Sequence, residues 1–175
     1  MTTARRPTFI CGFKACGKTT VGRLLSERLG VPWTDIDVLI TGSDASARSP
    51  REIYREDGNE AFRAAEKEAL KKALACEGVV SLGGGILESE ENRQDVTDHG
   101  MVVFIDLDLE EVWRRLQKDG LPAFIDKDDP RASCERIYHA RQGTFIGIAD
   151  IRIEAEGKTP DQIVEEIIAA IEKEA

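Results

Sequence analysis

A phosphate-binding loop stands near the start of the chain. Residues 12–19 read Gly-Phe-Lys-Ala-Cys-Gly-Lys-Thr and match the P-loop pattern G-x-x-x-x-G-K-[ST] at every fixed position. In such a loop, backbone N–H groups and a helix N-terminus converge on one point and bind nucleotide phosphates. Lys18 would reach the β- and γ-phosphates, and the Thr19 hydroxyl would coordinate Mg²⁺. The predicted nucleotide contacts are Gly12, Lys14, Ala15, Cys16, Gly17, Lys18, Thr19 and Thr20.

Two carboxylates, Asp35 and Asp37, follow the next apolar stretch and could act on a substrate. We expect a short strand to end at this pair. Because residues i and i+2 of an extended segment share a face, both side chains would point to the same side. The ends of such strands are where ligands bind in open α/β sheets. The alternative is structural, with Asp37 capping a helix that begins at Val38; the neighbouring P-loop favours the functional interpretation.

Two further patterns have both a structural and a functional interpretation. The run Gly83–Gly85 follows a predicted buried strand over 79–82, and it indicates either a flexible turn or a backbone that another group must approach closely. Arg63 and Glu66 are neighbours on one face of a predicted helix over 60–75. An exposed surface ion pair is the default interpretation of that spacing.

Cysteine usage indicates neither a metal centre nor a disulfide framework. The four cysteines form no C-x-x-C pair, and the two histidines have no partners at metal-ligand spacing. Cys16 lies in the P-loop beside Lys18, where a thiol pKa could be lowered. A small filler residue is the interpretation that the pattern favours.

Composition favours one domain over residues 1–175 that acts on small molecules. The net charge is −9 and no Lys/Arg-rich block is present, so the electrostatic footprint of a nucleic-acid-binding protein is missing. The hydrophobic content of 41% is enough for a core, and no apolar run is long enough to cross a bilayer. Only residues 1–7 precede the apolar segment before the P-loop, which leaves no room for a signal peptide. We therefore expect a cytoplasmic protein with no membrane partner.

Strands must alternate with helices to position these residues. Strand candidates cover Phe9–Cys11, the stretch that ends at the Asp35–Asp37 pair, and residues 79–82, 101–105 and 149–153. Helices between them imply right-handed βαβ units and a parallel sheet covered on both faces. Residues 118–130 break all periodicity, and a polar connection of this length predicts a mobile lid.

The order and spacing of these pieces resemble the shikimate kinase family. The resemblance rests on the P-loop, the Asp35–Asp37 pair, Phe62-Arg63 with Glu66, the Gly83–Gly85 strand end, and Arg141 followed by Ala149-Asp150, and it covers nearly the whole chain. It implies a three-layer P-loop NTPase fold of the nucleoside monophosphate kinase type, with a five-stranded parallel sheet. It also implies a lid over about 117–131, a helical substrate-binding region over about 38–76, and a monomer.

The same resemblance implies the reaction and the residues that carry it. ATP would phosphorylate the 3-hydroxyl of shikimate, with Asp37 as the catalytic base and Lys18 at the transferring phosphate. Asp35 would join Thr19 around Mg²⁺, Arg114 would lie at the adenine, and Glu66 would orient Arg63. The residues implied around shikimate are Asp37, Arg63, Gly84, Gly85 and Arg141.

The chain departs from the family in the lid, at a position that matters for rate. The family carries Arg-Pro in the lid, where this chain has Leu121-Pro122, and Ala15 stands where many small-molecule kinases carry glycine. A missing arginine at the transferring phosphoryl group can cost about 10³-fold or more. The candidate replacement cations are Lys14, Lys118, Lys127 and Arg131. Two alternatives therefore remain open: a kinase of another small anionic polyol such as gluconate, and a catalytically weak shikimate- or nucleotide-binding protein.

Overall fold

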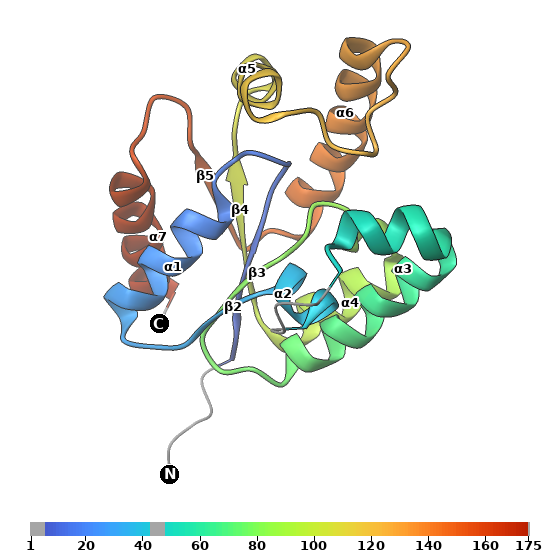
Figure 1. Cartoon of the computed structure of the whole chain (residues 1–175). Helices are drawn as coiled ribbons and strands as arrows, with labels where there is room; N and C mark the ends of the chain where they lie inside the picture. Colours follow the sequence, from blue (N-terminus) through green and yellow to red (C-terminus); the bar gives the residue numbers. More distant parts are fainter. Residues whose placement is uncertain (1–5, 43–47, 175) are drawn as a thin grey trace.

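Five parallel strands form the centre of the computed structural model, which describes residues 6–42 and 48–174 (Figure 1). The strands are β1 (Thr8–Cys11), β2 (Trp33–Asp35), β3 (Val79–Ser81), β4 (Met101–Asp106) and β5 (Ile151–Glu154). Their order is β2-β3-β1-β4-β5. The predicted five-stranded parallel sheet is confirmed, and the loop after its central strand β1 is the P-loop.

Helices follow each strand. They are α1 (Lys18–Leu29), α2 (Ile36–Thr41), α3 (Pro50–Leu74), α4 (Glu90–His99), α5 (Leu109–Asp119), α6 (Pro130–Ile148) and α7 (Pro160–Glu174), with a short 3₁₀ turn, η1 (Ile86–Glu88), before α4. The last strand begins two residues later than predicted. The small and polar residues over 41–48 predict a loop, and most of them lie outside the described residues.

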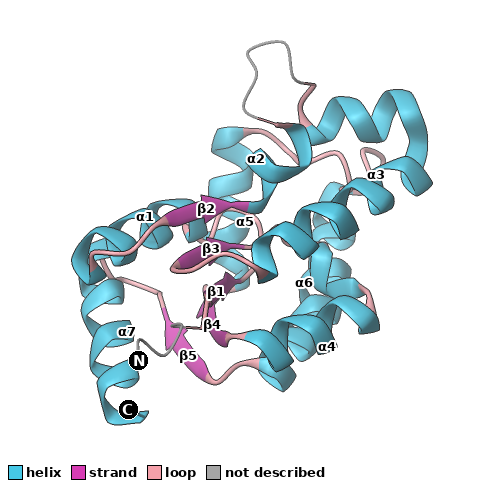
Figure 2. Cartoon of the chain, turned by 90° about the horizontal axis from the view of Figure 1, so that it is seen from below, coloured by secondary structure: helices cyan, strands magenta, loops and turns pink. Residues whose placement is uncertain are grey.

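The sheet separates two apolar layers, which confirms the three-layer architecture. Strand β1 sends Ile10 into a cluster shared with α1, α5, α6 and α7. It sends Phe9 and Cys11 into the opposite cluster, which includes residues of α2, α3 and α4. Figures 1 and 2 show α1 and α7 on one side of the strands and α2, α3 and α4 on the other. This alternation follows from the period of two in an extended strand.

Local signals in the sequence fix the start of α3 and its kink. Ser49 caps the helix: its Oγ accepts a hydrogen bond from the Glu52 N–H at 3.2 Å, and the Glu52 carboxylate accepts one from the Ser49 N–H at 2.7 Å. This reciprocal pair is the capping box that the sequence Ser49-Pro50-Arg51-Glu52 predicts. Gly58 has a φ of 87° and interrupts the helix, so Arg63 lies on a second helical segment, as the sequence predicts.

The segment between α5 and α6 is less polar in its contacts than its composition indicates. Ile125 is 4% exposed and packs into the core. Phe124 meets Phe13 of the P-loop edge-on, with 6.1 Å between ring centroids. Two apolar side chains therefore hold this segment against the phosphate loop.

No helix within residues 6–42 and 48–174 is long and apolar enough to cross a membrane.

Candidate active site

The P-loop has the backbone geometry that its glycines make possible. Gly12 has a φ of 152°, and a β-carbon there would lie 2.7 Å from the carbonyl oxygen of Ile105. Gly17, with a φ of 97°, precedes the first residue of α1. The Nζ of Lys18 donates to the carbonyl oxygens of Gly12 and Phe13, both at 2.8 Å. The ammonium group and the N-terminus of α1 thus lie at the same loop, as a phosphate site requires.

Ala15 is strained within this loop. Its φ of 68° makes it the one non-glycine residue with positive φ in the described part of the chain. A left-handed conformation costs an alanine about 1–2 kcal/mol. Alanine in place of glycine at position 15 therefore lowers the stability of the folded protein. The Ala15 carbonyl accepts a hydrogen bond from Nη1 of Arg115 at 3.1 Å. This contact helps to hold the strained conformation.

Replacing Ala15 with glycine should raise the free energy of unfolding by about 0.5–1 kcal/mol, because relief of strain exceeds the extra entropy of an unfolded glycine. In a protein of this size the midpoint of thermal unfolding would rise by about 2–4 °C per kcal/mol. Ala64→Gly is the control, since Ala64 lies on the exposed side of helix α3 and should lose about 1 kcal/mol. A lower midpoint for Ala15→Gly would contradict the strain argument.

Hard oxygen ligands lie beside the loop. The Thr19 hydroxyl donates to Oδ2 of Asp35 at 3.0 Å. No group of three or more His, Cys, Asp or Glu side chains that could hold a metal occurs in residues 6–42 and 48–174. One hydroxyl and one carboxylate nevertheless fit Mg²⁺, which keeps several waters and takes its other ligands from nucleotide phosphates.

The predicted geometry of the two aspartates is wrong. Asp35 ends β2 and caps α2, because its Oδ1 accepts a hydrogen bond from the Asp37 N–H at 2.9 Å. Asp37 therefore lies in the first turn of a helix rather than on an extended segment, and the capping residue is Asp35. The short polar pair Asp-x-Asp suits both conformations, so the spacing alone could not decide between them.

Asp37 nevertheless lies near the P-loop. Partial burial and the neighbouring charge of Asp35 raise the pKa of Asp37, while Lys14 and Lys18 oppose that rise. An aspartate whose pKa is raised is a better proton acceptor than an ordinary one. Its Oδ1 would lie 3.4 Å from a β-carbon on Gly83. Asp37 is thus placed between the phosphate loop and the glycine run.

The glycine run is needed for close approach. None of Gly83, Gly84 and Gly85 has positive φ, so a turn that only glycine can make is not the reason for the run. A β-carbon on Gly84 would lie 3.1 Å from Nη1 of Arg141, and one on Gly85 would lie 3.3 Å from Nη2. The first of these is also 4.0 Å from the Lys14 backbone nitrogen. The run thus joins Asp37, the P-loop and the guanidinium group of Arg141.

Arg63 and Glu66 do not form the exposed ion pair that was the default interpretation. Nη1 of Arg63 donates to Oε2 of Glu66 at 2.6 Å, and Glu66 is only 4% exposed. The same nitrogen donates to the Gly85 carbonyl at 3.2 Å. Burial raises the pKa of Glu66, although Arg63 opposes that rise. Glu66 therefore holds Arg63 against the glycine run, as the family resemblance implies.

Arg141 is the most deeply buried cation of the site. The residue is 8% exposed, and its Nη1 is a buried side-chain nitrogen that lacks a hydrogen-bond partner within the described residues. Its guanidinium carbon lies 4.6 Å from the ring centre of Phe124 and 5.6 Å from that of Phe13. Because an unpaired buried donor is costly, Nη1 is the atom of this site that most needs a ligand.

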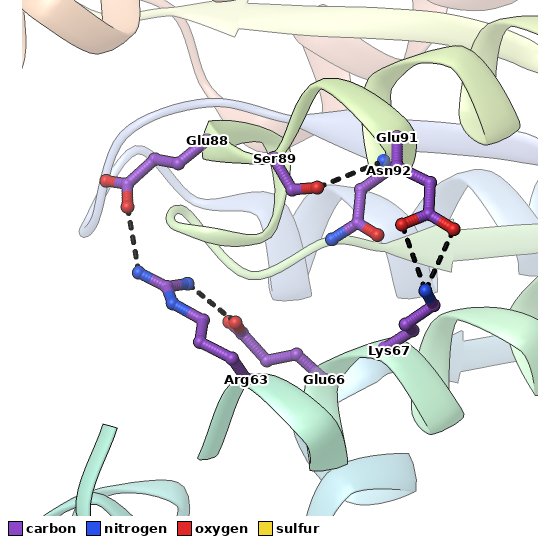
Figure 3. Close-up of a pocket in the computed structure, with 7 residues that line it drawn as sticks. All are labelled: Arg63, Glu66, Lys67, Glu88, Ser89, Glu91 and Asn92. Atoms are coloured by element: carbon purple, nitrogen blue, oxygen red, sulfur yellow. Dashed lines mark hydrogen bonds and ion pairs between the residues drawn. The ribbon is translucent and has the colours of Figure 1, made fainter. Parts of the chain in front are cut away.

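Glu88 is a site residue that the sequence interpretation missed. Its carboxylate bridges both arginines: Oε2 accepts from Nη2 of Arg63 at 2.9 Å, and Oε1 accepts from Nε and Nη2 of Arg141 at 2.9 and 2.7 Å. Figure 3 shows the contact with Arg63 at the edge of a pocket. Phe124 was missed as well. Neither Glu88 nor Phe124 belongs to a sequence motif or a periodic pattern. Their place in the site follows only from their proximity in space to the glycine run and the P-loop.

The structure does not bring every predicted residue to the loop. Arg114 is exposed and donates to the Glu111 carboxylate at 2.7 Å; its place at the adenine stays a prediction. Its neighbour Arg115 contacts the P-loop instead. Among the candidate lid cations, Arg131 pairs with Glu110 and lies over the ring of Trp113. Cys16 is 3% exposed, which favours the filler interpretation.

Comparison with known proteins points to one family. A family model described as shikimate kinase matches residues 14–172. The shikimate kinase of Persephonella marina is 36% identical over 95% of this chain and 99% of its own, and that of Ruegeria pomeroyi is 36% identical over 91% and 82%.

Solved structures agree on the fold. Shikimate kinase from Aquifex aeolicus has a TM-score of 0.77 at 29% identity, covering 96% of this chain and 97% of its own. The Acinetobacter baumannii enzyme in complex with shikimate has a TM-score of 0.88 at 24% identity over 97% and 94%. With the family model spanning almost the entire sequence, this chain belongs to the shikimate kinase family.

Proposed function

We propose that this protein transfers the γ-phosphate of ATP to the 3-hydroxyl of shikimate, giving shikimate 3-phosphate and ADP. The observation that carries the proposal is the buried, unpartnered Nη1 of Arg141, which faces Gly84 within a site shared with Asp37 and the P-loop. An anionic acceptor would satisfy this donor through its carboxylate. This reaction belongs to the biosynthesis of aromatic amino acids through chorismate.

Each predicted residue then has a task. Asp37 accepts the proton of the 3-hydroxyl as that oxygen attacks phosphorus, and Lys18 stabilises the charge on the transferring group. Thr19 and Asp35 are the residues that would hold Mg²⁺, directly or through water, and the bound ion would supply positive charge beside the phosphates. Arg63, Arg141, Gly84 and Gly85 hold the acceptor. The other loop residues bind the phosphates, and Arg114 lies at the adenine.

Lys14 is the cation that we propose in place of the absent lid arginine. Its charge lowers the pKa of Asp37 more than that of Lys18 does, so its ammonium group lies within electrostatic reach of the acceptor site. Its backbone nitrogen is close to Gly84. Arg131 is a poorer candidate, because Glu110 and Trp113 already hold it.

Leu121→Arg should raise kcat by about tenfold. Leu121 is exposed in the segment that covers the P-loop, and an arginine there could reach the transferring phosphoryl group. The gain should stay well below the roughly 10³-fold that a preorganised arginine supplies, because the new side chain would start from an exposed position. Leu121→Gln is the matched control and should leave kcat near its original value. A fall in kcat with arginine would show that the lid closes with another geometry.

Shikimate-dependent release of ADP tests the proposed reaction, and a panel of hydroxy acids including gluconate tests the acceptor. The runner-up function is a shikimate- and nucleotide-binding protein with little turnover, which Leu121 favours. Calorimetry would then find tight binding of both ligands without ADP release. We also propose that the protein acts as a monomer in the cytoplasm, which sedimentation of the purified chain and fractionation of its native cells would test.

A further inference from the structure

Glu88 occupies the contacts that an acceptor carboxylate would need. Both of its oxygens are engaged, one by Arg63 and the other by two nitrogens of Arg141, at 2.7–2.9 Å. This bridging of two guanidinium groups is the geometry in which arginines recognise a carboxylate ligand. An internal side chain therefore already occupies the arginine nitrogens that a carboxylate bridging Arg63 and Arg141 would use, and it leaves Nη1 of Arg141 free.

The charges at the site do not allow the Glu88 carboxylate and an acceptor carboxylate to contact Arg63 and Arg141 at the same time. Two guanidinium groups, Arg63 and Arg141, face the carboxylates of Glu66 and Glu88. A bound acceptor would bring a third carboxylate to the same two cations, and like charges at such short separation repel strongly where water is scarce. One of the two protein carboxylates must therefore move away.

Glu88 is the one that can move. Glu66 is buried on helix α3, whereas the Glu88 side chain is 43% exposed at the last residue of the short turn η1. A hollow beside Arg141 is lined by Glu88 and includes Arg93 and Arg136. Arg136 is exposed and forms no ion pair within the described residues. Rotation of the Glu88 side chain toward this hollow would leave it solvated and near a positive charge.

We propose that Glu88 is an internal competitor for the acceptor carboxylate, which binds only as Glu88 releases Arg63 and Arg141. This inference rests on the proposed function. It makes Glu88 a determinant of acceptor affinity, because part of the binding free energy is spent on breaking the existing ion pairs. The exchange also favours anions that reach both arginines over neutral polyols, since a neutral ligand cannot replace the charge that Glu88 withdraws.

Glu88→Gln should tighten equilibrium binding of shikimate by about tenfold, equivalent to about 1.4 kcal/mol, measured by calorimetry without ATP. KM for shikimate should fall with it. The uncharged methyl ester of shikimate is the probe that separates exchange from a general change of shape, and its affinity should not increase. Glutamine could keep a hydrogen bond to Arg141, and Glu88→Ala removes that contact together with the competing carboxylate. Glu88→Ala should therefore also tighten shikimate binding.

Glu91→Gln is the matched control, because Glu91 forms an ion pair with Lys67 on the neighbouring turn at 2.8 Å and touches neither arginine. It should leave shikimate affinity unchanged. Unchanged or weaker shikimate binding by both folded Glu88 variants would overturn the inference and identify Glu88 as a support for the arginines. If the unaltered protein binds no shikimate, the proposed function itself fails, and that outcome is separate from a failure at Glu88.

Discussion

Asp37→Asn should lower kcat by about 10²–10⁴-fold, the usual contribution of a positioned general base. Asparagine preserves the shape of the side chain but cannot accept the proton of the attacking hydroxyl. KM for ATP should change little, because the nucleotide contacts that we propose come from the P-loop. Steady-state kinetics with both substrates measures the effect, and a variant with full activity would remove Asp37 from the mechanism.

The same substitution should stabilise the folded protein at neutral pH. The folded state raises the pKa of Asp37 through partial burial and Asp35, so ionised Asp37 costs more in the folded chain than in the unfolded chain. Its contribution to stability is present below the unfolded pKa and is lost as pH rises through the folded pKa. The melting midpoint of Asp37→Asn should therefore exceed the original at pH 7, and the difference should shrink toward about pH 3. Lower stability at pH 7 would contradict this environment.

Arg141→Lys should raise KM for shikimate by about 10- to 100-fold, with little change in KM for ATP. A hydrogen bond to a charged group contributes about 1.5–3 kcal/mol, and lysine cannot reproduce the forked geometry of a guanidinium group. The free Nη1 and the stacking on Phe124 would both be lost. Kinetics at saturating ATP measures the change.

Arg152→Lys is the matched control for that substitution. Arg152 also donates Nε and Nη2 to one carboxylate, that of Asp106, but on the sheet away from the glycine run. Its replacement should leave KM for shikimate unchanged while lowering stability modestly. Equal shikimate KM values for the Arg141 variant and the unaltered protein would show that the acceptor does not contact Arg141.

Much of the architecture could be predicted because local signals carried it. The P-loop pattern, the apolar strand segments and the Ser49 capping box each act within a few residues, and each was confirmed. The aspartate pair was predicted with the wrong backbone, since a carboxylate that caps a helix and one that ends a strand have the same spacing. The hydrogen bond by which Asp35 caps helix α2 leaves no signal in the hydrophobic periodicity of the sequence.

The parts of the site that could not be predicted depend on distant contacts. Glu88 belongs to the site only because Arg63 and Arg141, which are 25 and 53 residues away in sequence, both contact its carboxylate. Phe124 lies in a segment rich in acidic residues, yet it stacks on the guanidinium group of Arg141. The family resemblance supplied Arg63 and Arg141, and it supplied neither of these partners.

The most direct test of the proposed function is a coupled ADP-release assay with ATP, Mg²⁺ and increasing shikimate. We expect saturable, shikimate-dependent release of ADP and, by phosphorus NMR, a product phosphorylated at the 3-hydroxyl. Gluconate at equal concentration should give little release. Absence of shikimate-dependent release at millimolar substrate, or phosphorylation at another hydroxyl, would contradict the account.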